Sequence, residues 1–203
     1  MTTTSRRGRF VAVLVTLGAL SAAGCSGGDE PAPGAETTSS PTVELSEPSD
    51  APTLEVEPVT KSGSIVGRLP KRDRNRVEGA VSDIAVRFLN AAYLAGDYPR
   101  ADFRDSYPGF TGGAARVARN DLRLLTNKPI GEKVDEITAT GIGVKVDLLA
   151  VGKRAVASTA HVELAFRTVG KIKKRFRVQG RLLMTKKNGS WKIFAYDLSK
   201  GAR

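Results

Sequence analysis

Apolar side chains recur with a period of two over four successive stretches of this chain: 142–150, 156–166, 176–184 and 191–195. Successive side chains of a β-strand point to opposite faces of a sheet, so this period predicts four half-buried strands. The connections are too short for crossover helices, which favours an antiparallel meander. The core of this chain is therefore expected on one face of that sheet.

Two turns set the expected strand register. Asn188-Gly189 is typical of a two-residue hairpin loop, because both positions accept positive φ. A three-residue loop over 170–172 keeps apolar rows together, whereas a two-residue loop at Gly170-Lys171 would set Phe166 against Arg175 and mix the faces. The expected partners are Trp191 with Lys186, Ile193 with Met184, Ala195 with Leu182, Tyr196 with Arg181, Phe166 with Phe176, and His161 with Arg181.

Helical patterns precede the strands. Apolar residues at steps of three and four over 77–95 predict an amphipathic helix that Gly96 ends. A short helix towards Asp105 and a third over 114–125 are also expected. The sequence therefore predicts an α+β domain over 68–203, with two to three N-terminal helices on one face of a curved four-stranded antiparallel sheet.

Residues 88–98, FLNAAYLAGDY, and 188–193, NGSWKI, resemble the NTF2-like or cystatin-like superfamily. The resemblance implies a cavity between the helices and the sheet. Its expected lining is Phe88, Phe166, Phe176, Val178, Leu182, Met184, Trp191 and Ile193. Enzymes of the superfamily are isomerases, cyclases or dehydratases that place Asp or His in this cavity. No acid or base falls on the predicted cavity face here, because His161 and Asp147 are expected on the opposite face.

The N-terminus is typical of an export signal. Arg6, Arg7 and Arg9 precede fifteen uncharged residues, 10–24. Ser21-Ala22-Ala23-Gly24-Cys25 then resembles the lipobox of bacterial lipoproteins, which implies cleavage after residue 24 and a diacylglycerol on Cys25. An ordinary secretory signal is the alternative, and general secretion is favoured over twin-arginine export. The expected location is outside the cytoplasm, on the outer face of the cell membrane.

Residues 25–63 are expected to form a disordered tether. Positions 26–63 hold six prolines, eight acidic residues and a single cation, Lys61. The chain as a whole has a net charge of +11, so the positive charge is concentrated in the predicted domain. A lipobox followed by such a tether is similar to actinobacterial envelope proteins, including those associated with mammalian-cell-entry transport systems.

The sheet face away from the helices is expected to be basic, with an apolar corner. Its predicted docking residues are His161, Arg167, Lys173, Arg175, Arg177, Arg181, Leu183, Phe194 and Tyr196. A solvated strand face is the alternative interpretation. Export separates these cations from nucleic acid, so the expected polyanions are anionic lipids or cell-wall polymers.

These observations predict a non-catalytic, lipid-anchored envelope protein. Its domain is expected to bind a partner protein, a second copy of the chain or an apolar ligand, as an accessory to transport or cell-wall assembly. The alternative is a small isomerase or dehydratase that uses acid–base catalysis. The chain has one cysteine and one histidine, which are too few for a cysteine-ligated or a multi-histidine metal site. No cofactor is expected.

Overall fold

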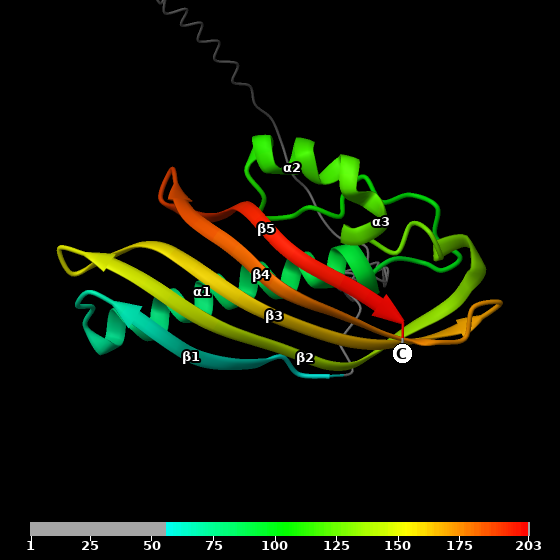
Figure 1. The fold of residues 1–203 in the computed structure, drawn as a ribbon, viewed down its shortest axis with the longest axis horizontal. Helices are drawn as coiled ribbons and strands as arrows, with labels where there is room; N and C mark the ends of the chain where they lie inside the picture. Colours follow the sequence, from blue (N-terminus) through cyan, green and yellow to red (C-terminus); the bar gives the residue numbers. More distant parts are fainter. Residues whose placement is uncertain (1–55, 203) are drawn as a thin grey trace, which may run out of the picture. The chain divides into compact units, whose positions relative to one another are not determined.

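The computed structural model describes residues 56–202, which form one five-stranded sheet with helices (Figure 1). The strand order is β1-β2-β3-β4-β5. The strands are β1 (Val59–Val66), β2 (Val134–Val151), β3 (Arg154–Gly170), β4 (Arg175–Lys187) and β5 (Ser190–Ala202). The predicted signal, Cys25 and most of the predicted tether lie outside the described residues.

The predicted four-stranded antiparallel sheet, preceded by helices, is wrong. The sheet is mixed, because β1 precedes the helices in the chain and runs parallel to β2. The NTF2-like fold assignment is overturned with it. Strand β1 begins at Val59, ahead of the predicted boundaries at residues 63 and 68.

The polar character of β1 explains why its sequence did not predict a strand. Two of its side chains towards the helix are hydroxyls: Thr60 Oγ1 lies 2.6 Å from Ser82 Oγ, and Ser62 Oγ donates to Glu78 Oε2 at 2.7 Å. Both partners belong to α1 (Lys71–Leu89). Hydrogen bonds here replace the apolar row that normally marks a half-buried strand.

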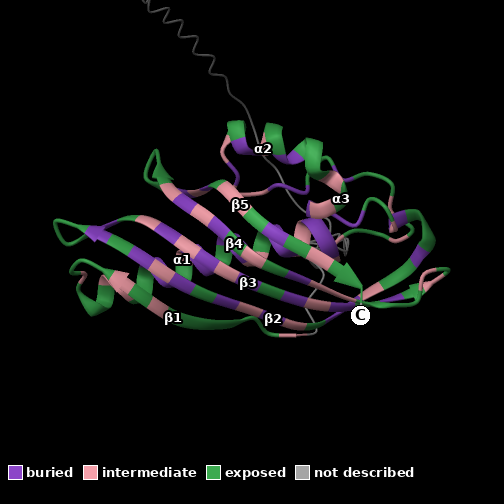
Figure 2. Cartoon of the chain, in the orientation of Figure 1, coloured by how far each residue is buried: buried purple, intermediate pink, exposed green. Residues whose placement is uncertain are grey.

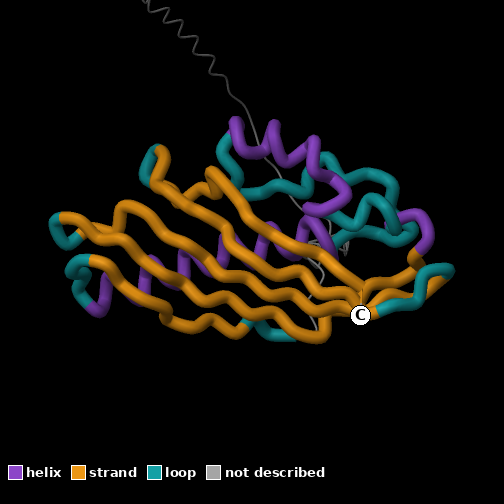
Figure 3. The backbone as a smooth tube through the Cα atoms, viewed as in Figure 1, coloured by secondary structure: helices purple, strands orange, loops and turns teal. Residues whose placement is uncertain are grey.

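The helices lie on one side of the sheet (Figures 1 and 3). Helix α1 packs on β2 and β3 and continues into a π-helical turn, Asn90–Leu94, just before Gly96. Helices α2 (Gly112–Ala118) and α3 (Leu122–Leu125) pack along β5. Residues 99–105 contain no helix, so the short helix expected towards Asp105 is wrong.

Most of the predicted register is confirmed. Phe166 pairs with Phe176, His161 with Arg181, and Ile193 with Met184. The ladder then shifts between Leu183 and Met184. The expected partners of Ala195 and Tyr196 are therefore wrong: Ala195 lies opposite Leu183, and Tyr196 lies opposite Leu182.

A β-bulge at Phe194 causes this shift. The extra residue in β5 reverses the side on which every later residue of that strand points. Segment 109–111 pairs with the strand at this place: Thr111 N–H donates to the Ile193 carbonyl at 2.8 Å, and Ile193 N–H donates to the Gly109 carbonyl at 2.9 Å. Phe110 thereby enters the core beside β5.

Candidate functional site: the open face of the sheet

Within the part of the chain that the structure describes, no helix covers the sheet face turned away from α1, and we call this face the open face. Buried and exposed positions alternate along the central strands (Figure 2), and the buried set faces α1. We define the open face by one row of residues across the sheet, with one residue from each strand. Residues two positions before or after these along each strand belong to the same face. The row is Lys61, Lys145, His161, Arg181 and Asp197.

An ion pair stands at the centre of the open face. His161 Nε2 lies 2.7 Å from Asp147 Oδ2, and Ser64 N–H donates to Asp147 Oδ1 at 2.8 Å. Partial burial raises the pKa of Asp147, but the hydrogen bonds from Ser64 and His161 outweigh it, so the net pKa is lowered. Asp147 therefore joins β1, β2 and β3 and holds the imidazole in one orientation.

The other cations predicted for this face either form salt bridges or lie opposite one another on neighbouring strands. Arg181 Nη2 lies 2.5 Å from Asp197 Oδ2, and Arg177 bonds to Glu163. Arg167 lies directly opposite Arg175, and Lys173 is in the turn between β3 and β4. Opposed arginines repel unless water or an anion separates them. The predicted basic rows are thus brought together as expected.

The predicted apolar corner is only partly present. Leu183 is half-buried, and Phe194, in the bulge, is 45% exposed. Tyr196 is not on the open face: its hydroxyl donates to Asp121 Oδ2 at 2.6 Å, and its ring packs against Phe110. Burial and the contact with Asp121 raise the pKa of Tyr196. The bulge places this side chain towards the core.

A different apolar area lies at the opposite edge of the open face, on β1 and β2. Leu149 of β2 is 41% exposed, and it pairs with Val66 of β1, which is 64% exposed. Ala157 of β3 lies on the other side of Leu149. Sequence reasoning missed this area because it depends on β1, and the apolar end of β1 could have indicated it.

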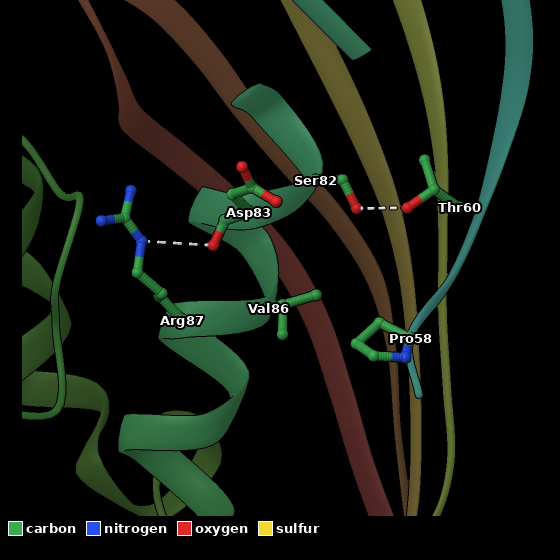
Figure 4. Close-up of a pocket in the computed structure, with 6 residues that line it drawn as sticks. All are labelled: Pro58, Thr60, Ser82, Asp83, Val86 and Arg87. Atoms are coloured by element: carbon green, nitrogen blue, oxygen red, sulfur yellow. Dashed lines mark hydrogen bonds between the residues drawn. The ribbon is translucent and has the colours of Figure 1, made fainter. Parts of the chain in front are cut away.

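Two grooves flank β1, and neither was expected from the sequence. The first, of about 370 Å³, lies on the open face and is lined by Val59, Lys61, Gly143, Val144, Lys145, His161, Val162 and Glu163. The second, of about 540 Å³, lies between β1 and α1 (Figure 4). Thr60 and Ser82 bridge its two sides, and Arg87 Nε donates to the Asp83 carbonyl at 3.3 Å. Both grooves are open to solvent and mixed in polarity.

The predicted cavity lining forms part of the packed core. Phe88, Leu182, Met184, Val178 and Ile193 have no exposed surface. Phe166 is 1% exposed and stacks on Phe176, with ring centroids 5.3 Å apart. Trp191 is also buried, at 6%. None of these eight residues lines either groove described above.

Three comparisons were made with known proteins. No family model, curated protein or solved structure matches. Within residues 56–202, no helix is both long and apolar enough to span a bilayer. Over the same residues, no three His, Cys, Asp or Glu side chains are grouped closely enough to hold a metal ion.

The open face offers charged and apolar contacts around one oriented imidazole. Such an imidazole can donate a hydrogen bond or exchange a proton. The hydroxyl of Ser158, a buried residue of β3, donates to the backbone carbonyl of Asp147 at 3.1 Å.

Proposed function

We propose that this protein is exported and lipid-anchored through Cys25, and that its domain binds a partner protein through the open face. The anchor rests on the lipobox-like sequence alone. One observation carries the docking proposal: α1 covers one face of the sheet, and no helix or strand among residues 56–202 covers the opposite face.

The composition of the open face supports a protein partner. Its centre carries the cations Lys145 and Arg181 beside His161, and its edge near β1 is apolar, at Leu149 and Val66. Protein interfaces combine apolar contact with paired polar groups in this way, and exposed apolar patches often mark them. The matching partner surface would present carboxylates opposite the lysine and arginine side chains.

The core supports a protein partner over an apolar ligand. The side chains expected to line a ligand cavity pack against one another, as the stacked rings of Phe166 and Phe176 show. The enzyme alternative required an acid or base facing such a cavity. His161 and Asp147 instead pair on the open face, which supports binding over acid–base catalysis.

Lysine labelling tests the docking proposal in native membranes. The expected result is that Lys145 reacts slowly with an amine-specific reagent in intact membranes and quickly after purification in detergent. Lys71, exposed at the start of α1, is the matched control and should react equally in both samples. Equal reactivity of Lys145 in both samples would contradict docking through the open face.

Membrane fractionation tests the anchor separately. The Cys25→Ala protein should leave the membrane fraction, because two or more acyl chains give far firmer membrane attachment than one. If the Cys25→Ala protein stays in the membrane fraction unchanged, the anchor proposal is wrong. The docking proposal is tested separately, by the labelling of Lys145.

A further inference from the structure

The turn between β3 and β4 carries a dense group of cations at one end of the sheet (Figure 1). We call residues 167–177 the hairpin tip. Its cations are Arg167, Lys171, Lys173, Lys174, Arg175 and Arg177. Five of the six are exposed, and Arg177 is half-buried. This end of the sheet lies away from the apolar pair Val66 and Leu149.

Hydrogen bonds fix the backbone of the hairpin tip. Thr168 is 2% exposed; its hydroxyl donates to the Ile172 carbonyl at 2.7 Å and accepts from Lys174 N–H at 3.1 Å. Ile172 N–H donates to the Lys133 carbonyl at 3.0 Å. The lysines are therefore presented from a turn with a defined shape.

The charge of the hairpin tip is only partly neutralised. Three carboxylates approach it: Glu163 bonds to Arg177, Glu136 lies opposite Val169, and Asp135 lies beside Gly170. Among the described residues, Arg177 is the one cation of the tip in a salt bridge. Six cations against three carboxylates leave a clear positive excess.

Two apolar side chains accompany these cations. Val169 is 40% exposed, and Ile172 in the turn is half-buried. Cations beside exposed apolar groups suit the boundary of a bilayer, where lysine and arginine meet headgroup phosphates and short apolar groups enter the interface. A soluble polyanion would gain nothing from Val169.

From these observations, we propose that the hairpin tip binds the anionic phosphate surface of a phospholipid membrane. The proposal rests on the lipid anchor only for access. The 33 residues between Cys25 and Val59 could reach at most roughly 120 Å, so the tip can return to the membrane that holds the anchor. Contact through the tip would fix the orientation in which the domain meets its partner.

Vesicle binding tests this proposal without the anchor. The mature chain from residue 25, carrying Cys25→Ser, is mixed with vesicles of phosphatidylcholine alone or of phosphatidylcholine with phosphatidylglycerol. It should sediment with the anionic vesicles only, and added salt should release it. Sedimentation with both kinds of vesicle, or with neither, would overturn the proposal.

Matched variants locate the binding surface. Replacing Lys171, Lys173 and Lys174 by Gln should weaken binding to anionic vesicles roughly a hundredfold, since each lysine near an anionic surface contributes about fivefold. The control replaces Arg68, Lys71 and Arg72 by Gln, which removes the same charge from exposed sites around the start of α1. The control should bind within about threefold of the parent. Equal losses in both variants would contradict a specific role for the tip.

Binding to a soluble polyanion distinguishes a lipid surface from other polyanions as the ligand of the hairpin tip. Inorganic polyphosphate at the same phosphate concentration as the vesicles should bind the chain more weakly, because it offers no interface to Val169 and Ile172. Tighter binding to polyphosphate would overturn the lipid assignment and favour a cell-wall polymer. These vesicle results are independent of Cys25, so failure of the anchor and failure of the tip are distinguishable.

Discussion

At the scale of single residues, Asp147 of β2 connects three strands through its carboxylate. One carboxylate accepts from Ser64 N–H at 2.8 Å and lies 2.7 Å from His161 Nε2, so it connects the edge strand to the centre of the open face. The sequence predicted that Asp147 and His161 point away from the helices, but not that they pair. The pairing depends on the long register of β2 with β3, which has no signature in local sequence.

Replacing Asp147 by Asn should lower the free energy of unfolding by about 1 kcal/mol, because Asn keeps the shape but loses the charge that strengthens both hydrogen bonds. Urea unfolding measures this. Asp197→Asn is the control: its exposed pair with Arg181 should contribute less than about 0.5 kcal/mol. Equal costs for the two variants would contradict the role given to Asp147.

Lys200 should make stability depend on pH. Burial, aided by Arg123, lowers the pKa of Lys200 to about 8 from 10.5. Between these values the unfolded chain binds more protons than the folded one, so stability attributable to Lys200 rises with pH. Unfolding followed from pH 7 to 9.5 should show the parent gaining stability relative to Lys200→Met; parallel curves would contradict this.

At the scale of elements, the sequence predicted those with a strong apolar period and missed those held by polar contacts. The four antiparallel strands and α1 were recognisable, and the Phe166–Phe176 register followed from the need to keep apolar rows together. Strand β1 was not, because hydroxyls and Glu78 hold it to α1. The bulge at Phe194 was missed because residues 109–111 pair with β5 next to it, and this segment is distant from β5 in the sequence.

Glu78 should be the strongest single attachment of β1. It is 6% exposed and accepts from Ser62 Oγ and from Arg74 Nε, at 2.7 and 2.8 Å. Glu78→Ala leaves these donors unpaired and should cost about 1–3 kcal/mol, with faster amide exchange in β1. Asp83→Ala, at an exposed position of α1, should leave exchange in β1 unchanged. Slow exchange in β1 of Glu78→Ala would show that the strand is held by other contacts.

At the scale of the whole molecule, apolar and charged side chains lie on different faces of the sheet. The core lies between α1 and the inner face of the sheet, and the open face carries the charged side chains. The sequence predicted this division and the basic rows, because the alternation of apolar and polar residues along the strands determines both. It did not anticipate the grooves beside β1 or the apolar area at Leu149, because both require a fifth strand.

Site-specific photocrosslinking in living cells tests docking through the open face most directly. A photoreactive residue replaces Thr159, which lies beside His161 on this face, or Asn75, which is exposed on α1. The account predicts a discrete adduct from position 159 and none from position 75; an adduct of twice the mass would identify the partner as a second copy. No adduct from position 159, or the same adduct from both positions, would contradict it.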